Sequence, residues 1–221
     1  MTFGTGETSR FDVPEDLTLL PPDPAGVCDL VRRFLVSWHV MEVAEASTAN
    51  TNEVLAAERR LGLSLPYALR WAFMHIGFDN RIVGQQDPFV HPRDLEVDED
   101  GVLIYRVENQ YCAAWGFPVV DASADDPPVV WKDLQAGSEG RWLPYHERIS
   151  VDLLEMALNE AMLRPGVDVL DMELVSGVPS ELSKLVPLAI PEHAFWPIPE
   201  GPLVAWYGTR DCLIRRDGDA W

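Results

Sequence analysis

The sequence lacks the residue patterns that disulfide scaffolds, zinc sites and membrane spans require. It has only three cysteines, Cys28, Cys112 and Cys212, which lie far apart and never in a Cys-x-x-Cys pair. This spacing is typical of reduced thiols in a cytoplasmic protein. No apolar run approaches the roughly 18 residues of a membrane helix. The N-terminal segment lacks the basic and apolar parts of a secretory signal. We therefore expect a cytoplasmic protein with no membrane partner.

Positive charge is also scarce in this chain. Lys and Arg total 17 against 36 Asp and Glu, which gives a formal net charge of −19 at pH 7. A surface of this sign repels nucleic acid and anionic membranes, because phosphate binding depends on cationic side chains that release counter-ions. Such a surface suits a basic partner, but it also simply keeps a protein soluble. Composition therefore argues against nucleic-acid binding, and it is consistent either with a basic partner or with solubility alone.

Motifs of the common enzyme classes are missing as well. The chain has no phosphate-binding loop, no Gly-x-Ser-x-Gly and no His-Glu-x-x-His. A near match to a calcium loop begins with Glu96, Asp98 and Asp100, but Val107 stands where the loop needs a glutamate. We predict an acidic turn before a strand at this place. We also predict no catalytic residues, no cofactor and no metal site.

The five histidines occur singly along the sequence. His75 lies in an apolar helical pattern, where a lone histidine is more often a core or boundary residue than a ligand. A hydrolase built from dispersed carboxylates and His146 remains an alternative, since only absent motifs argue against it. That alternative predicts a cleft in which carboxyl pKa values are strongly shifted.

Hydrophobic periodicity predicts helices first and mainly strands later. The Gly-, Thr- and Pro-rich residues 1–24 are expected to form an extended or mobile arm, and residues 25–221 a single domain. This order of elements predicts an α+β fold with a mainly antiparallel sheet and extra C-terminal strands. The predicted helices are 26–38, 51–61, 66–76, 150–164 and a short one within 179–188. The predicted strands are 102–107, 111–115, 127–132, 203–207 and 212–215.

Acidic residues concentrate between Asp87 and Asp126. This stretch holds ten Asp and Glu against two basic residues, Arg93 and Arg106, and aromatic side chains are interspersed among them. A solvated surface explains the charge alone, whereas aromatic anchors inside a charged rim are typical of tight protein interfaces. We take this stretch as the candidate partner-binding surface. The candidate contact residues are Asp98, Glu99, Asp100, Glu108, Trp115, Asp125 and Asp126.

Several motifs follow one another in the middle of the chain. A helix with Glu-x-x-Leu-Gly-x-x-Leu-Pro precedes an aromatic-rich helix ending in Gly, a strand with Asn-Gln and Trp, then Asp-Pro-Pro-Val and a Ser-capped helix. These residues are Glu58, Leu61, Gly62, Leu65, Pro66, Gly77, Asn109, Gln110, Trp115, Asp126, Pro127, Pro128, Val129 and Ser150. Their order resembles the SUKH superfamily, which includes a fungal cell-wall-assembly regulator. The resemblance covers about residues 50–162.

This resemblance implies a helical layer packed on a curved, mainly antiparallel sheet. It also implies a non-catalytic protein without cofactors, because the superfamily has no catalytic residues to carry over. Bacterial members resemble immunity proteins that bind and neutralise a cognate toxin, often a nuclease. We therefore expect a binding protein whose acidic surface docks a basic, nuclease-type toxin domain. A regulatory protein-interaction scaffold, as among the fungal members, is the alternative.

Overall fold

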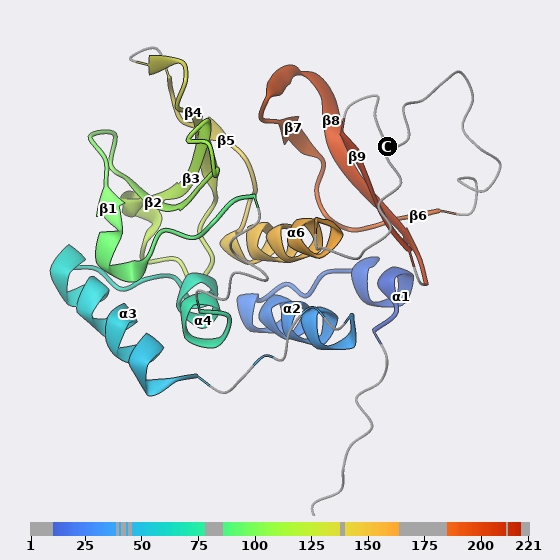
Figure 1. Ribbon diagram of the computed structural model, residues 1–221, viewed down its shortest axis with the longest axis horizontal. Coiled ribbons are helices and arrows are strands. Elements are labelled where there is room, and N and C mark those ends of the chain that lie inside the picture. Colours follow the sequence, from blue (N-terminus) through green and yellow to red (C-terminus); the bar gives the residue numbers. More distant parts are fainter. Residues whose placement is uncertain are drawn as a thin grey trace, which may run out of the picture.

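The computed structural model describes residues 11–38, 40, 43, 46–77, 86–137, 140–163, 185–210 and 212–217. Over these residues the chain is an α+β protein with five α-helices and two antiparallel sheets (Figure 1). The predicted fold class is confirmed. The C-terminal strands form a separate second sheet instead of extending the first. Within the described residues, every helix is too short or too polar to cross a lipid bilayer.

The N-terminal segment folds against the core. The side chain of Asp12 caps helix α1, Val13–Leu17, by accepting a hydrogen bond from a backbone N–H of the first turn. Phe11 and both end residues of α1 are buried. The prediction of an extended or mobile arm is therefore wrong for residues 13–17, because a few closely spaced apolar side chains anchor a short helix there. Residues 1–10 lie outside the described part of the chain.

Two longer helices follow, and both begin at a side-chain cap. Helix α2, Pro24–Ser37, has Asp23 as its N-cap and proline in its first turn, where a missing N–H costs no hydrogen bond. Helix α3, Thr48–Leu61, has Ser47 as its N-cap. Both helices lie where periodicity predicts them, and α3 begins three residues earlier than predicted because Ser47 satisfies the first free N–H groups.

A tight connection joins α3 to helix α4, Tyr67–His75. Gly62 ends α3 in the left-handed conformation, with φ 71°, which glycine adopts without strain. The Glu58 carboxylate accepts a hydrogen bond from the Leu65 N–H (2.8 Å) and pairs with Arg70 (3.4 Å). The Glu-x-x-Leu-Gly-x-x-Leu-Pro motif thus fixes the crossing of the two helices.

The first sheet has five strands in the order β1-β2-β3-β4-β5, all antiparallel. Its strands are β1 Glu96–Val97, β2 Val102–Val107, β3 Ala113–Pro118, β4 Val130–Asp133 and β5 Leu143–Pro144, with 3₁₀ turns η1 Pro92–Asp94 and η2 Val119–Asp121. The predicted hairpin is the β2–β3 pair. A register shift between Ile104 and Arg106 lets two neighbours in sequence, Tyr105 and Arg106, both be buried.

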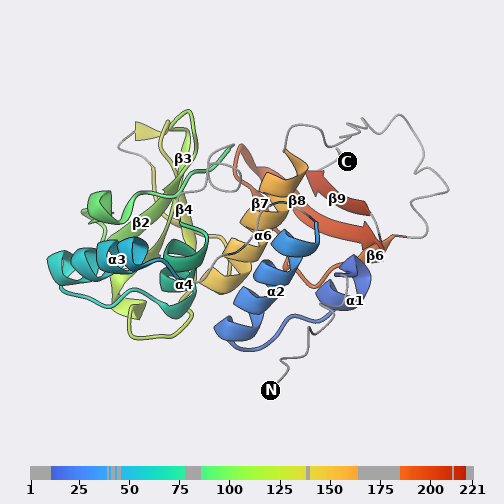
Figure 2. The same ribbon diagram turned by 60° about the horizontal axis from the view of Figure 1, so that its bottom comes forward.

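Helix α6, Ile149–Met162, lies at the centre of the molecule. It packs along α2 and has the first sheet on one side and the second sheet on the other (Figure 2). Twelve of its 14 residues are buried. The carboxylate of Asp126 caps it by accepting hydrogen bonds from the Ser150 N–H (2.9 Å) and hydroxyl (2.6 Å). The expectation of a Ser150 cap is therefore wrong, because Ser150 is a donor to a capping group from another segment.

The second sheet is built around one long strand. Its strands are β6 Val186–Pro187, β7 His193–Phe195, β8 Ile198–Thr209 and β9 Cys212–Asp217. Strand β8 pairs with each of the other three. The predicted strands 203–207 and 212–215 are confirmed as parts of β8 and β9. The predicted helix within 179–188 is wrong at its end, where β6 lies, and residues 179–184 lie outside the described part.

Candidate functional site

The structure contains the predicted acidic turn before the first hairpin, and side-chain hydrogen bonds of Asp98 hold this turn. One carboxylate oxygen of Asp98 accepts hydrogen bonds from the N–H groups of Asp100 (3.0 Å) and Val102 (2.9 Å). The other accepts one from the Trp142 indole (2.7 Å). Asp98 is thus half-buried and holds the turn, whereas Glu99 and Asp100 are exposed. Two of these three candidate contacts are accessible to a partner.

Glu108 and Trp115 lie inside the protein. The Glu108 carboxylate is buried and accepts hydrogen bonds from the N–H groups of Gln110 (2.7 Å) and Cys112 (3.2 Å). It therefore shapes the β2–β3 turn. Trp115 is 1% exposed, and the Arg106 guanidinium lies 4.2 Å from its ring centre. Neither side chain is available for partner contact in this fold, so the interpretation of both as interface residues does not fit the structure.

The remaining two candidates, Asp125 and Asp126, have different surroundings. Asp126 is half-buried and caps α6, whereas Asp125 is exposed and lines a surface hollow beside α4. Asp100 lines a second, smaller hollow of about 310 Å³ near Trp142. The candidate residues therefore do not form one surface, and Asp125 alone adjoins the larger hollow.

Two networks of buried charge are centred on α6. In the first, Asp152 accepts hydrogen bonds from the Tyr105 hydroxyl (2.7 Å) and the Arg106 guanidinium (2.9 Å). Burial alone would lower the pKa of Arg106, but Asp152 holds that pKa above its ordinary value. The ion pair satisfies both charges and fixes the bulge of β2 against α6.

The second network joins both sheets to α6. One oxygen of Glu155 accepts hydrogen bonds from His193 Nε2 (2.8 Å) and Trp206 Nε1 (3.1 Å), and the other accepts one from His146 Nε2. His146 follows β5 of the first sheet, whereas His193 and Trp206 lie on β7 and β8 of the second. Burial alone would raise the pKa of Glu155, but the two imidazoles hold it well below its ordinary value.

His193 is placed as an imidazolium. Its Nδ1 faces the carbonyl of Ala194 (2.9 Å) and its Nε2 faces Glu155, so both ring nitrogens donate. Burial lowers the pKa of His193, but the Glu155 carboxylate and the Ala194 carbonyl together raise it above the ordinary value. A buried positive charge and a buried negative charge therefore compensate each other at the junction of α6 and the second sheet.

Two histidines and a glutamate are also a ligand set that divalent metal ions accept. The three ligand atoms lie within 4.8 Å of one another. Hydrogen bonding nevertheless explains the cluster better, because its 2.8 Å contact is an ordinary N–H···O distance and Trp206 already donates to the carboxylate. His146 Nδ1 also has no hydrogen-bond partner among the described residues, whereas a metal-bound histidine is oriented by such a partner. We interpret the cluster as a structural joint between α6 and the two sheets.

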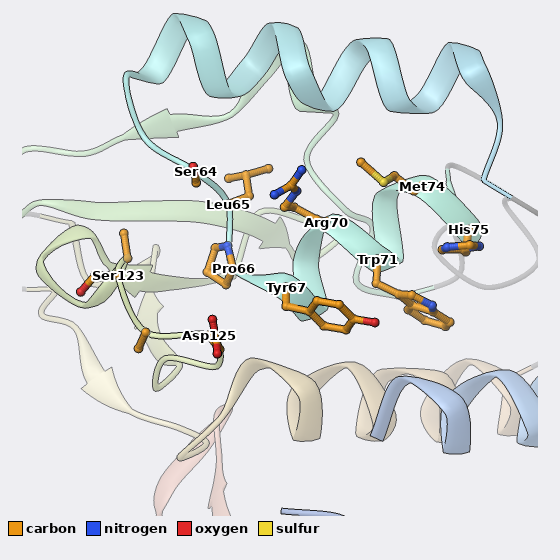
Figure 3. A pocket seen from close by; sticks show the side chains of 12 residues that line it. Ser64, Leu65, Pro66, Tyr67, Arg70, Trp71, Met74, His75, Ser123 and Asp125 are labelled. Carbon is orange, nitrogen blue, oxygen red and sulfur yellow. The ribbon is translucent and has the colours of Figure 1, made fainter. Parts of the chain in front are cut away.

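The larger hollow, of about 560 Å³, lies between α4 and the segment 122–125 (Figure 3). Tyr67 is 45% exposed, and Trp71 and His75 follow at one-turn intervals and are half-buried. The Trp71 and His75 rings stack at 5.4 Å. Figure 3 shows Tyr67 and Trp71 side by side, while Arg70 points to the other side of the helix, toward α3. We call the face formed by Tyr67, Trp71 and His75 the aromatic wall.

The aromatic wall has a sequence signal that is distinct from the apolar stripe of α4. Buried residues of α4 occupy the opposite face, at Ala68, Leu69, Ala72 and Phe73. Aromatic side chains at 67, 71 and 75 recur every four residues and therefore share the other face. Two large aromatic side chains on the exposed face of a short helix are a feature of interfaces. His75 lies at the boundary of the core, as predicted.

In comparisons with known proteins, no protein-family model, curated protein or solved structure matches this chain. The resemblance to the SUKH superfamily therefore remains a prediction from sequence motifs.

Proposed function

We propose that this chain is a non-catalytic binding protein that captures and neutralises a basic, nuclease-type toxin domain. The observation that supports this best is a partly exposed aromatic wall with the exposed carboxylate of Asp125 across the hollow, on a chain of net charge −19. Interfaces of high affinity commonly combine aromatic anchors with a polar or charged rim. The resemblance of residues 50–162 to immunity proteins points to the same class of function.

The acidic surface follows from how the chain uses its few cations. Most described arginines and lysines bind carboxylates or carbonyls of the same chain. Arg106 pairs with Asp152 in the core, and Lys132 pairs with Asp100 at the acidic turn (3.2 Å). Cations held in this way do not form a phosphate-binding patch. Asp and Glu also outnumber Lys and Arg by 36 to 17, so an excess of negative charge remains to attract a basic partner.

Capture of a basic toxin proceeds in two steps under this proposal. Attraction between opposite charges speeds the encounter, and salt weakens this attraction. Contact of the toxin with aromatic side chains then excludes water and slows dissociation. The bound acidic protein occupies the cationic surface on which a nuclease holds phosphate groups. Neutralisation therefore needs no chemical step by this chain.

The test is to isolate the partner and measure its inhibition. Immobilised protein is exposed to host lysate at about 0.1 M and about 1 M salt, between which the Debye length falls from about 10 Å to about 3 Å. The retained partner is then purified and assayed for cleavage of DNA and RNA with increasing amounts of this chain. We expect a basic partner, retained best at low salt, whose nuclease activity stops at an equimolar ratio.

Either of two other results would contradict the proposed function. Retention of several proteins without toxic activity, none of them inhibited, would favour the regulatory scaffold. Retention of no protein at either salt concentration, together with hydrolytic activity of the chain that is lost on His146→Gln substitution, would favour the hydrolase.

A further inference from the structure

We infer that the hollow beside α4 binds an arginine or lysine side chain of a basic protein partner, held between the aromatic wall and Asp125. This inference rests on the proposed function and names the surface and the chemistry by which it would act. The occupant is a protein segment, because the acidic surface repels nucleic acid and anionic membranes.

The aromatic wall supplies the first element of such a site. Tyr67 and Trp71 lie one turn apart and present their rings to the hollow (Figure 3). A guanidinium or ammonium group within about 6 Å of an aromatic ring centre is attracted to the ring face. The chain itself uses this contact, since the Arg106 guanidinium lies 4.2 Å from the ring centre of Trp115. Planar guanidinium groups also stack on aromatic rings.

Negative charge supplies the second element. Asp125 is exposed on the wall opposite α4. Desolvation raises the pKa of Tyr67, and the nearby Cys28 and Asp23 raise it further, which places Asp23 within electrostatic reach of the same ring. Among the described residues that line the hollow, the guanidinium of Arg70 pairs with Glu58 (3.4 Å) and points toward α3. The space beside Tyr67 and Trp71 therefore favours a positive charge.

Both walls of the hollow are fixed before any partner arrives. The Tyr67 N–H donates to the Asp125 carbonyl (3.3 Å), which ties the start of α4 to the opposite wall. The turns of that wall are closed by hydrogen bonds from Ala122 N–H to Val119 (3.0 Å) and from Ala124 N–H to Asp121 (2.9 Å). A preformed site loses less conformational entropy when it binds a partner. A larger part of the contact energy therefore contributes to the binding affinity.

The charge requirement can be tested with a pair of matched peptides. One is a nine-residue peptide with three arginines separated by glycine and serine, and the other has citrulline at the same positions. Citrulline keeps the shape of arginine and removes its charge. Binding to the full chain is followed by two-dimensional NMR of the tryptophan indole N–H signals and by titration. We expect only the arginine peptide to shift the Trp71 signal.

Variants of the chain then locate the site. We expect Trp71→Ala to weaken binding of the arginine peptide about tenfold and Asp125→Asn to weaken it several-fold. Tyr67→Ala provides a second ring deletion at a more exposed position, in case Trp71→Ala alters the fold. The control is Tyr111→Asn, which removes a 74% exposed aromatic side chain at another turn, where φ is 60° and asparagine is tolerated. We expect this control to bind as wild type does.

The inference is overturned if citrulline and arginine peptides bind equally, or if Tyr67→Ala and Asp125→Asn both bind as wild type does. Its failure can be told apart from failure of the proposed function. A toxin that is inhibited equally by wild type and by these variants leaves the function standing and removes the site. Arginine-dependent binding at Trp71, with no inhibited toxin in the host, leaves the site standing and removes the function.

Discussion

Replacing Glu155 by glutamine should destabilise the protein strongly, although the side chain keeps nearly the same volume. The substitution removes the negative charge that compensates the buried His193 imidazolium. It also replaces the carboxylate oxygen that accepts the hydrogen bond from the Trp206 indole. His193 and Glu155 are 6% and 1% exposed, so solvent cannot replace the lost partner. Removing one member of a buried pair costs about 3–5 kcal/mol in the free energy of unfolding. For a chain of this length, the Tm should fall by about 6–20 °C.

The same variant should change the pH dependence of stability. Glu155 has a lowered pKa in the fold, so its contribution is present above its unfolded pKa, about 4.3, and is lost as pH falls through the folded value. His193 has a raised pKa, so its contribution is complete below its unfolded pKa, about 6.5, and is lost as pH rises through the folded value. The joint is therefore strongest between about pH 4.3 and about pH 6.5.

Urea unfolding at several pH values, followed by tryptophan fluorescence, measures both effects. The control is Glu200→Gln, which neutralises an exposed carboxylate on β8 and should change stability by less than about 0.5 kcal/mol. If Glu155→Gln lost less than about 1 kcal/mol and kept the pH profile of wild type, the charge of Glu155 would not stabilise this joint.

Three further substitutions or reactions test other parts of the fold. Asp126→Ala removes the cap of α6 and should cost about 1–2 kcal/mol in urea unfolding, whereas Asp126→Asn should cost less because its amide oxygen still accepts one hydrogen bond. Gly208→Ala places a Cβ 2.3 Å from Cγ1 of Val13 and should cost about 1–3 kcal/mol, with faster proteolysis of the α1 segment. Burial raises the pKa of Cys28 to about 12, so two thiols should react with a thiol reagent in the native protein and the third only after unfolding. Rapid native reaction of all three would contradict the buried position of Cys28.

The sequence predicts best where local chemistry decides the structure. Gly62 and Pro66 mark the connection of α3 to α4, and alternation marks the β2–β3 hairpin, because turn geometry and periodicity act over a few residues. The short helix α1 is missed because its apolar residues are too few to show a period. Their burial depends on contact with β8, which local sequence does not reveal.

Site residues are harder to predict, because their burial and their neighbours depend on contacts between segments that are distant in sequence. Glu108 and Trp115 look like interface residues because charge and aromatic character are visible in sequence while burial is not. The joint of His146, Glu155 and His193 combines three distant segments, and only the fold brings them together. Asp125 is the candidate that stays accessible beside the aromatic wall, and the spacing of Tyr67 and Trp71 is the signal that could have located that wall.

The contact of α1 with the second sheet has a consequence for synthesis on the ribosome. The Ala189 N–H donates to the Leu17 carbonyl (2.7 Å), and Arg210 pairs with Asp12 (3.6 Å). Translation proceeds at about 5–20 residues per second, so the N-terminal segment waits on the order of ten seconds or more for these partners. During this time Val13 of α1 lacks the strand β8 that lies against it in the folded protein. We expect this segment to be a target of chaperones during translation, while the walls of the hollow, made earlier, can already form.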